Sequence, residues 1–155
     1  ETLFNMLMPN LPDAVFIDLF SGSGGIGIEA LSRGANKAYF VENNQKAVAC
    51  ITENLEHTHL SDRAVVLRQD VFAALRGSIR DTADIIFLDP PYQQEYDRKV
   101  LELLRDAAFV TDDTLIVVEA SATTSFDYVD TLGFVVEKSK QYKTNKHVFI
   151  KRNTQ

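Results

Sequence analysis

A strand that ends in an acid and two prolines is the feature that most constrains the fold. Residues 85–92 read Ile-Ile-Phe-Leu-Asp-Pro-Pro-Tyr. Such an apolar run is typical of a strand buried on both faces of a parallel sheet. The strand must stop at Asp89, because Pro90 cannot donate to a sheet ladder and holds the residue before it extended. The Asp89 carboxylate, the Pro90 carbonyl and the Tyr92 ring are therefore predicted in a stiff loop at the carboxyl end of a strand, where open α/β sheets bind ligands.

The strand-then-helix pattern occurs five times along the chain. Five such units predict a parallel sheet with helices on both faces. Apolar runs place the five strands at residues 14–19, 37–42, 64–68, 85–88 and 114–119. Two more runs predict a closing strand pair, and hence an antiparallel edge strand, at residues 133–136 and 147–150. We also expect a short helix at residues 123–132, and Cys50 in the core on the apolar face of a helix that Asn43 or Asn44 caps.

Length and composition indicate one soluble domain that spans residues 1–155. A chain of 155 residues can bury roughly two thirds of its unfolded surface in a single core. No apolar run approaches the roughly 20 residues of a membrane helix, so no membrane partner is expected. The single cysteine excludes an intramolecular disulfide framework and favours a reducing compartment, the cytoplasm. The histidines His57 and His59 are too few for a metal site, so no metal is expected.

The charge of the chain is unevenly distributed. The net charge is −6, but residues 138–155 carry six basic residues and no acid. Such asymmetry is typical of a polyanion-facing edge on an acidic body. A solvated hairpin explains the same pattern equally well.

A glycine loop lies between the first strand and the helix after it. The spacing Gly22-x-Gly24-x-x-Gly27 allows a tight turn and close approach of a ligand to the backbone. The motif fits a dinucleotide as well as S-adenosylmethionine, and Glu42 lies about 20 residues on, where either fold places an acid that binds ribose.

Acids lie at the carboxyl ends of four successive strands, and they distinguish S-adenosylmethionine from a dinucleotide. Asp18 could anchor the glycine loop or attract an ammonium group, and it would repel a pyrophosphate. Asp70 could accept from an adenine amino group while the Val71 backbone contacts the ring edge. With Glu42 and Asp89 these acids form a cluster that favours a cationic, donor-rich ligand. Each acid taken singly is better explained as a helix cap or a solvated side chain.

Together these segments resemble the bacterial 16S ribosomal RNA guanine-N2 methyltransferases of the RsmD type. The resemblance is carried by residues 1–5, 18–35, 42, 70–71 and 89–92 and extends over nearly the whole chain. It implies a Rossmann-like class I methyltransferase fold, with S-adenosylmethionine as the methyl donor. It also implies 16S rRNA or the small ribosomal subunit as the partner. We expect the protein to be a monomer. The basic segment that this family carries ahead of the position of Glu1 is absent from this sequence.

The expected site residues fall into two groups. The cofactor-binding residues are Asp18, Phe20, Ser21, Gly22, Gly24, Gly27, Glu42, Asn43, Asp70 and Val71. The catalytic residues are Asp89 and Pro90, which would accept the two N–H bonds of the guanine amine, and Tyr92, which would stack on the base. Three alternatives stay open: a DNA adenine or protein glutamine amide as the acceptor, a cofactor-binding module without catalysis, and a nicotinamide oxidoreductase.

Overall fold

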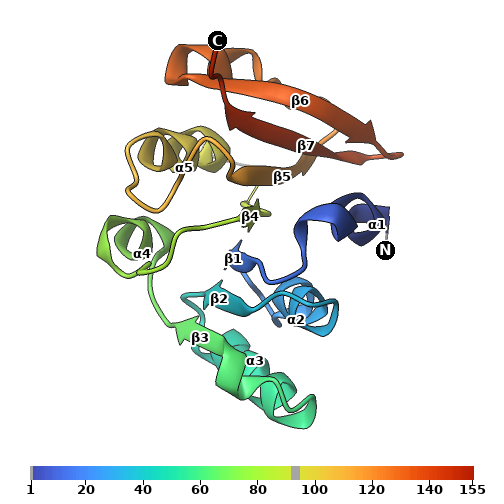
Figure 1. The fold of residues 1–155 in the computed structure, drawn as a ribbon, viewed down its shortest axis with the longest axis vertical. Helices are drawn as coiled ribbons and strands as arrows, with labels where there is room; N and C mark the ends of the chain where they lie inside the picture. The colour runs from blue at the N-terminus through green and yellow to red at the C-terminus, as the bar shows by residue number, and fades with distance from the viewer. Residues whose placement is uncertain (1, 92–94) are drawn as a thin grey trace.

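A mostly parallel, seven-stranded sheet forms the middle layer of the molecule (Figure 1). The computed structural model describes residues 2–91 and 95–155. The strands are β1 (Val15–Leu19), β2 (Lys37–Val41), β3 (Ala64–Leu67), β4 (Ile85–Leu88), β5 (Leu115–Ser121), β6 (Phe134–Gln141) and β7 (Asn145–Arg152). They lie in the order β3-β2-β1-β4-β5-β7-β6. The first five run parallel, and β7 runs antiparallel to both β5 and the outermost strand β6.

Helices cover both faces of this sheet, as Figure 1 shows. One face is covered by α1 (Thr2–Leu7), α2 (Gly25–Ser32) and α3 (Gln45–His57). The other is covered by α4 (Val71–Gly77), α5 (Tyr96–Arg105) and the 3₁₀-helix Asp127–Leu132. Two shorter 3₁₀-helices lie at Met8–Asn10 and Ser61–Arg63.

Side-chain alternation along the central strands divides the core in two. Phe16 and Ile17 of β1 are both fully buried, and they belong to the clusters on opposite faces of the sheet. Successive strand residues point to opposite faces, so a strand covered on both sides must be apolar throughout. Each large side chain buried in this way contributes about 1.5–3 kcal/mol, which holds the strand ends in fixed positions.

The predicted α/β architecture is confirmed, including the edge pair with its antiparallel strand. Two local predictions are wrong. Cys50 is exposed, because the buried stripe of α3 consists of Ile51 and Leu55. The helix expected at residues 123–132 is reduced to the 3₁₀-helix Asp127–Leu132.

The closing hairpin β6–β7 is longer than the sequence indicates. Seven of the eight residues of β6 are exposed, and the basic side chains are spread along this hairpin. Two of them cover aromatic rings: the Lys138 ammonium lies 5.0 Å from the Phe149 ring centre, and that of Lys146 lies 5.5 Å from the Phe126 ring centre. Within the described ranges, no helix is long and apolar enough to cross a membrane.

Candidate active site

The carboxyl ends of the parallel strands bring the predicted acids to one edge of the sheet. The strand order places Asp70 after β3, Glu42 after β2, Asp18 in β1 and Asp89 after β4. The acids that are separated in sequence are therefore arranged in a row across the sheet edge.

The glycine loop between β1 and α2 is held by Asp18. Its carboxylate Oδ2 accepts from the backbone N–H of Gly27 at 3.2 Å, and the Ser21 hydroxyl donates to its backbone oxygen at 2.7 Å. Gly22 and Gly24 have φ values of +57° and +86°, which only glycine adopts without strain. The loop-anchoring alternative for Asp18 is thus the one that the hydrogen bonds support.

Asp18 is a buried acid, with 1% of its surface exposed. Its pKa is raised to about 8, mainly by burial and to a smaller extent by the negative charges of Asp89 and Glu42. The hydrogen bond from the Gly27 N–H opposes this shift. A cationic ligand at this edge would relieve the repulsion among the three carboxylates.

Glu42 joins the ends of two strands. One carboxylate oxygen accepts from the Gly22 N–H at 2.8 Å, and the other accepts from the Asn44 N–H at 3.0 Å. Each oxygen keeps a second lone pair, so the carboxylate can still accept from ligand hydroxyls. Asn44 is the residue that caps α3, by accepting from the Ala47 N–H, while its neighbour Asn43 is exposed.

Asp70 is the N-cap of α4. Its carboxylate accepts from the N–H groups of Phe72 and Ala73 at 3.1 and 3.3 Å. Helix capping therefore accounts for an acid at the Asp70 position even when no ligand is bound. Val71 begins α4 and is 6% exposed, and a backbone N–H at this position has no acceptor within the helix.

Asp89 lies beside an open hollow of about 440 Å³ lined by Phe20, Asp89, Pro90 and Pro91. The Phe20 ring is stacked on that of Tyr96, with ring centres 6.1 Å apart. Although Asp89 is partly exposed, its pKa is raised to about 6, mainly by desolvation and also by the Glu119 charge, while His147 opposes the shift. Tyr92 lies outside the described residues.

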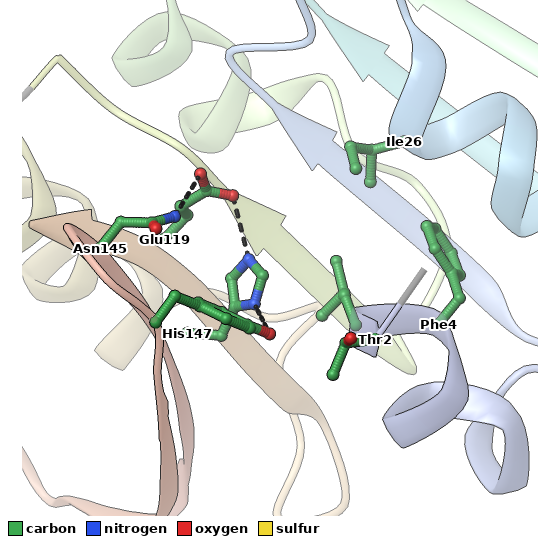
Figure 2. A pocket seen from close by; sticks show the side chains of 8 residues that line it. Thr2, Phe4, Ile26, Glu119, Asn145 and His147 are labelled. Carbon is green, nitrogen blue, oxygen red and sulfur yellow. Dashed lines mark hydrogen bonds and ion pairs between the residues drawn. The ribbon is translucent and has the colours of Figure 1, made fainter.

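Sequence reasoning missed a polar group next to Asp89. The Glu119 carboxylate of β5 contacts His147 Nε2 at 3.0 Å and accepts from the Asn145 amide at 3.1 Å. His147 Nδ1 in turn lies 2.9 Å from the Tyr142 hydroxyl. Figure 2 shows Glu119, Asn145 and His147 on one side of a cavity, opposite Thr2, Phe4 and Ile26. Glu119 ends the fifth predicted strand, so the signal that identified the other four acids could have found it.

The Glu119 carboxylate is the negative charge in this group of Glu119, Asn145 and His147. The hydrogen bond from His147 lowers the pKa of Glu119, and that from Asn145 acts in the same direction. The cavity that it borders measures about 420 Å³. Among the residues that the structure describes, no cluster of histidine, cysteine and acids could hold a metal ion. The Glu119 carboxylate offers acceptors to hydrogen-bond donors in the cavity.

Comparison with known proteins agrees with this chemistry. The family model described as "Conserved hypothetical protein 95" matches residues 1–151. A *Bacillus subtilis* protein named "Putative rRNA methyltransferase YlbH" is 35% identical over 143 residues, which are 91% of this chain and 77% of that protein. The *Escherichia coli* K12 protein "Ribosomal RNA small subunit methyltransferase D" is 36% identical over 121 residues, or 77% of this chain. This chain spans only 60% of the length of that protein.

A solved structure gives the same result for the fold. The *Escherichia coli* protein described as "Putative methyltransferase yhhF" superimposes with a TM-score of 0.83 at 27% identity. The match covers 99% of this chain and 84% of that one. The predicted Rossmann-like class I methyltransferase fold is therefore confirmed.

Proposed function

This chain belongs to the conserved hypothetical protein 95 family, the RsmD type, and from that premise we propose that it methylates 16S ribosomal RNA. The methyl group passes from S-adenosylmethionine to the exocyclic N2 amine of a guanine. The observation that carries the proposal is the position of Asp89, at the carboxyl end of β4 beside the open hollow that Phe20 and Pro90 line. Two relatives named for rRNA methylation support RNA as the acceptor.

The cofactor is assigned to the β3–β2–β1 part of the sheet edge. When bound, it supplies a methyl group on a sulfonium cation. Glu42 accepts from the ribose hydroxyls with its free lone pairs, while Asp70 accepts from the adenine amine and the Val71 backbone contacts the ring edge. The remaining contacts come from Phe20, Ser21, Gly22 and Asn43, while Asp18, Gly24 and Gly27 shape the loop that presents them. The clustered carboxylates fit this group, because a cation and several N–H and O–H donors lower their mutual repulsion.

The acceptor amine is oriented by the loop after β4. The lone pair of a guanine amine is delocalised into the ring, so the amine is a poor nucleophile. The Asp89 carboxylate and the Pro90 carbonyl accept its two N–H bonds and turn the lone pair toward the methyl group. Tyr92 stacks on the base and fixes its plane. Catalysis then rests on positioning and on the Asp89 charge, which stabilises the amine as it becomes cationic. The bond between sulfur and the methyl group breaks, S-adenosylhomocysteine leaves, and the methylated amine gives up one proton to Asp89 or to water.

Methylation of a guanine in 16S rRNA also defines the partner of this protein. The partner is 16S rRNA, either free or in the small ribosomal subunit, and the guanine must be flipped out or presented in a loop to reach Asp89. The enzyme works as a cytoplasmic monomer, without a metal ion or a membrane.

The test is a methylation assay with isotopically labelled S-adenosylmethionine. Small-subunit rRNA, assembled small subunits, DNA and protein are offered in parallel, and the modified nucleoside or amino acid is identified by mass spectrometry. Label in N2-methylguanosine from one of the two RNA substrates is expected. Label in N6-methyladenine or in a glutamine amide would replace the proposal with the corresponding acceptor, and no label in any substrate would contradict it.

A further inference from the structure

We propose that the cavity beside Glu119 holds the Watson–Crick edge of the acceptor base and that Glu119 selects guanine by accepting its ring N1–H. Asp89 accepts from the neighbouring N2 amine of the same base. The inference rests on the proposed function and goes beyond it, because it names the residue that distinguishes guanine from other bases with an amino group.

Strand register brings the backbones of Asp89 and Glu119 close together. Leu88, the last residue of β4, is paired in register with Val118 of β5, so Asp89 directly follows β4 while Glu119 is the next residue within β5. Neighbouring strands are about 4.8 Å apart. The influence of Glu119 on the pKa of Asp89 agrees with this proximity. The N1–H and N2 amine of guanine are adjacent donors on one edge, so two adjacent carboxylates match them.

Glu119 is held in position and still has capacity to accept. Its oxygens use one lone pair each for His147 and Asn145, and a carboxylate offers about four acceptor sites. Because a carboxylate only accepts, His147 Nε2 must donate to it. The Glu119 side chain is 25% exposed, so a ligand in the cavity can reach it. His147 and Asn145 act as positioning residues.

The location of the cavity suits the acceptor. In the strand order, Glu42 and the glycine loop lie on one side of Asp89, and Glu119 and His147 lie on the other. A methyl donor bound at the glycine loop leaves the β5–β7 side to the group that receives the methyl. The cavity of about 420 Å³ has Phe4 and Ile26 on the wall opposite Glu119, which gives apolar surface for a flat base (Figure 2).

This arrangement distinguishes bases by one hydrogen. Adenine and cytosine place a ring-nitrogen lone pair beside their amine, and that lone pair would face the Glu119 carboxylate. Guanine places a donor there. An enzyme site that hydrogen-bonds a donor of its substrate discriminates against an analogue that lacks this donor. The discrimination in kcat/KM reaches about 10⁴–10⁵-fold.

The test uses 2-aminopurine, which keeps the N2 amine but lacks the N1–H. After the methylated guanine has been located by mass spectrometry, synthetic small-subunit rRNA is prepared with guanine or 2-aminopurine at that position. It is presented free or assembled, in whichever form the wild-type protein methylates. The ratio of kcat/KM for guanine to that for 2-aminopurine is measured for the wild type and for Glu119→Gln. The wild type should prefer guanine by about 10²-fold or more, and Glu119→Gln should lower that ratio at least tenfold.

Controls separate this role from a structural one. Glu56→Gln makes the same change at an exposed position of α3 and should leave the ratio unchanged. Asn145→Ala removes one hydrogen bond to Glu119 and should lower the ratio severalfold, which keeps the test available if Glu119→Gln folds poorly. Binding of S-adenosylhomocysteine should be the same in all variants.

Two outcomes overturn different claims. Ratios that stay within threefold of the wild-type value in both Glu119→Gln and Asn145→Ala would overturn the role of Glu119 while the methylguanine product remains. A wild-type protein that forms no N2-methylguanosine would instead overturn the proposed function.

Discussion

Asp89 and Glu119 follow two register-paired residues, Leu88 of β4 and Val118 of β5. The row of acids therefore continues past Asp89 to Glu119, which lies within β5 and contacts His147 on β7. Burial raises the pKa of both Asp18 and Asp89, and a neighbouring negative charge, Asp89 for the former and Glu119 for the latter, acts in the same direction. A fold that keeps so many acids together is arranged for a ligand with positive charge and many donors.

Changes at Asp89 should reduce turnover. Asp89→Ala should lower kcat by about 10²–10³-fold, comparable to the loss of one preorganised hydrogen-bonding group, with little change in cofactor affinity. Asp89→Asn should lower kcat only partially, because an amide oxygen still accepts from the amine. Single-turnover kinetics with labelled cofactor measure both, and a near wild-type rate for Asp89→Ala would exclude a role in orienting the amine.

The same residue should set the acid limb of the pH profile. The ionised carboxylate is the stronger acceptor and also stabilises positive charge on the amine, so the rate should rise with pH through the pKa of Asp89, which is raised to about 6. The bound sulfonium cation lowers that pKa, so the limb should lie at or below pH 6. The profile of Asp89→Asn should lack this limb between pH 4 and 7, and an identical limb in that variant would assign the titration to another group.

Glu42 should contribute to cofactor affinity. Glu42→Ala should weaken binding of S-adenosylhomocysteine by about 1–3 kcal/mol, because ligand hydroxyls and the Gly22 N–H lose an acceptor. Isothermal titration calorimetry measures the change. Glu56→Ala, at an exposed position of α3, is the matched control and should bind like the wild type. Equal affinity in Glu42→Ala would place the ribose elsewhere.

Gly27 should be irreplaceable for packing. A Cβ at Gly27 would lie 2.4 Å from Cε2 of the buried Phe40 ring, whereas a Cβ at Gly25 would have no atom within 4 Å. Gly27→Ala should lower the free energy of unfolding by about 1–3 kcal/mol, and Gly25→Ala should be nearly neutral. Urea denaturation compares the two, and equal stabilities would contradict the close contact between α2 and β2.

Some features of this fold could be predicted from the sequence, and others could not. The strand positions and the glycine loop could be predicted, because apolar runs and the spacing from Gly22 to Gly27 are local features of the sequence. The exposure of Cys50 could not, because a rotation of α3 by one residue decides which side chain faces the sheet. The contact between Glu119 and His147 could not either, since it depends on the register of β5 against β7. Asp70 shows the remaining ambiguity, because a helix cap and a ligand-binding acid occupy the same position in a sequence.

The basic hairpin should contribute non-specific contact with phosphate. Lys140 and Lys143 are exposed, and Lys146 is partly covered by its contact with Phe126. Replacing Lys140 and Lys143 by Gln should reduce the slope of log K against log salt for RNA binding by about 1–2. The charge-matched pair Lys46→Gln and Arg80→Gln, on other surfaces, should leave the slope unchanged. A slope unaffected by the hairpin changes would mean that the hairpin is only a solvated edge.

The most direct test of methyl transfer to guanine is mass spectrometry of 16S rRNA from a strain that lacks the gene for this chain. We expect the loss of one N2-methylguanosine, its return when the full-length wild-type gene is supplied, and no return with Asp89→Ala. An rRNA methylation pattern identical to that of the parent strain would contradict the account.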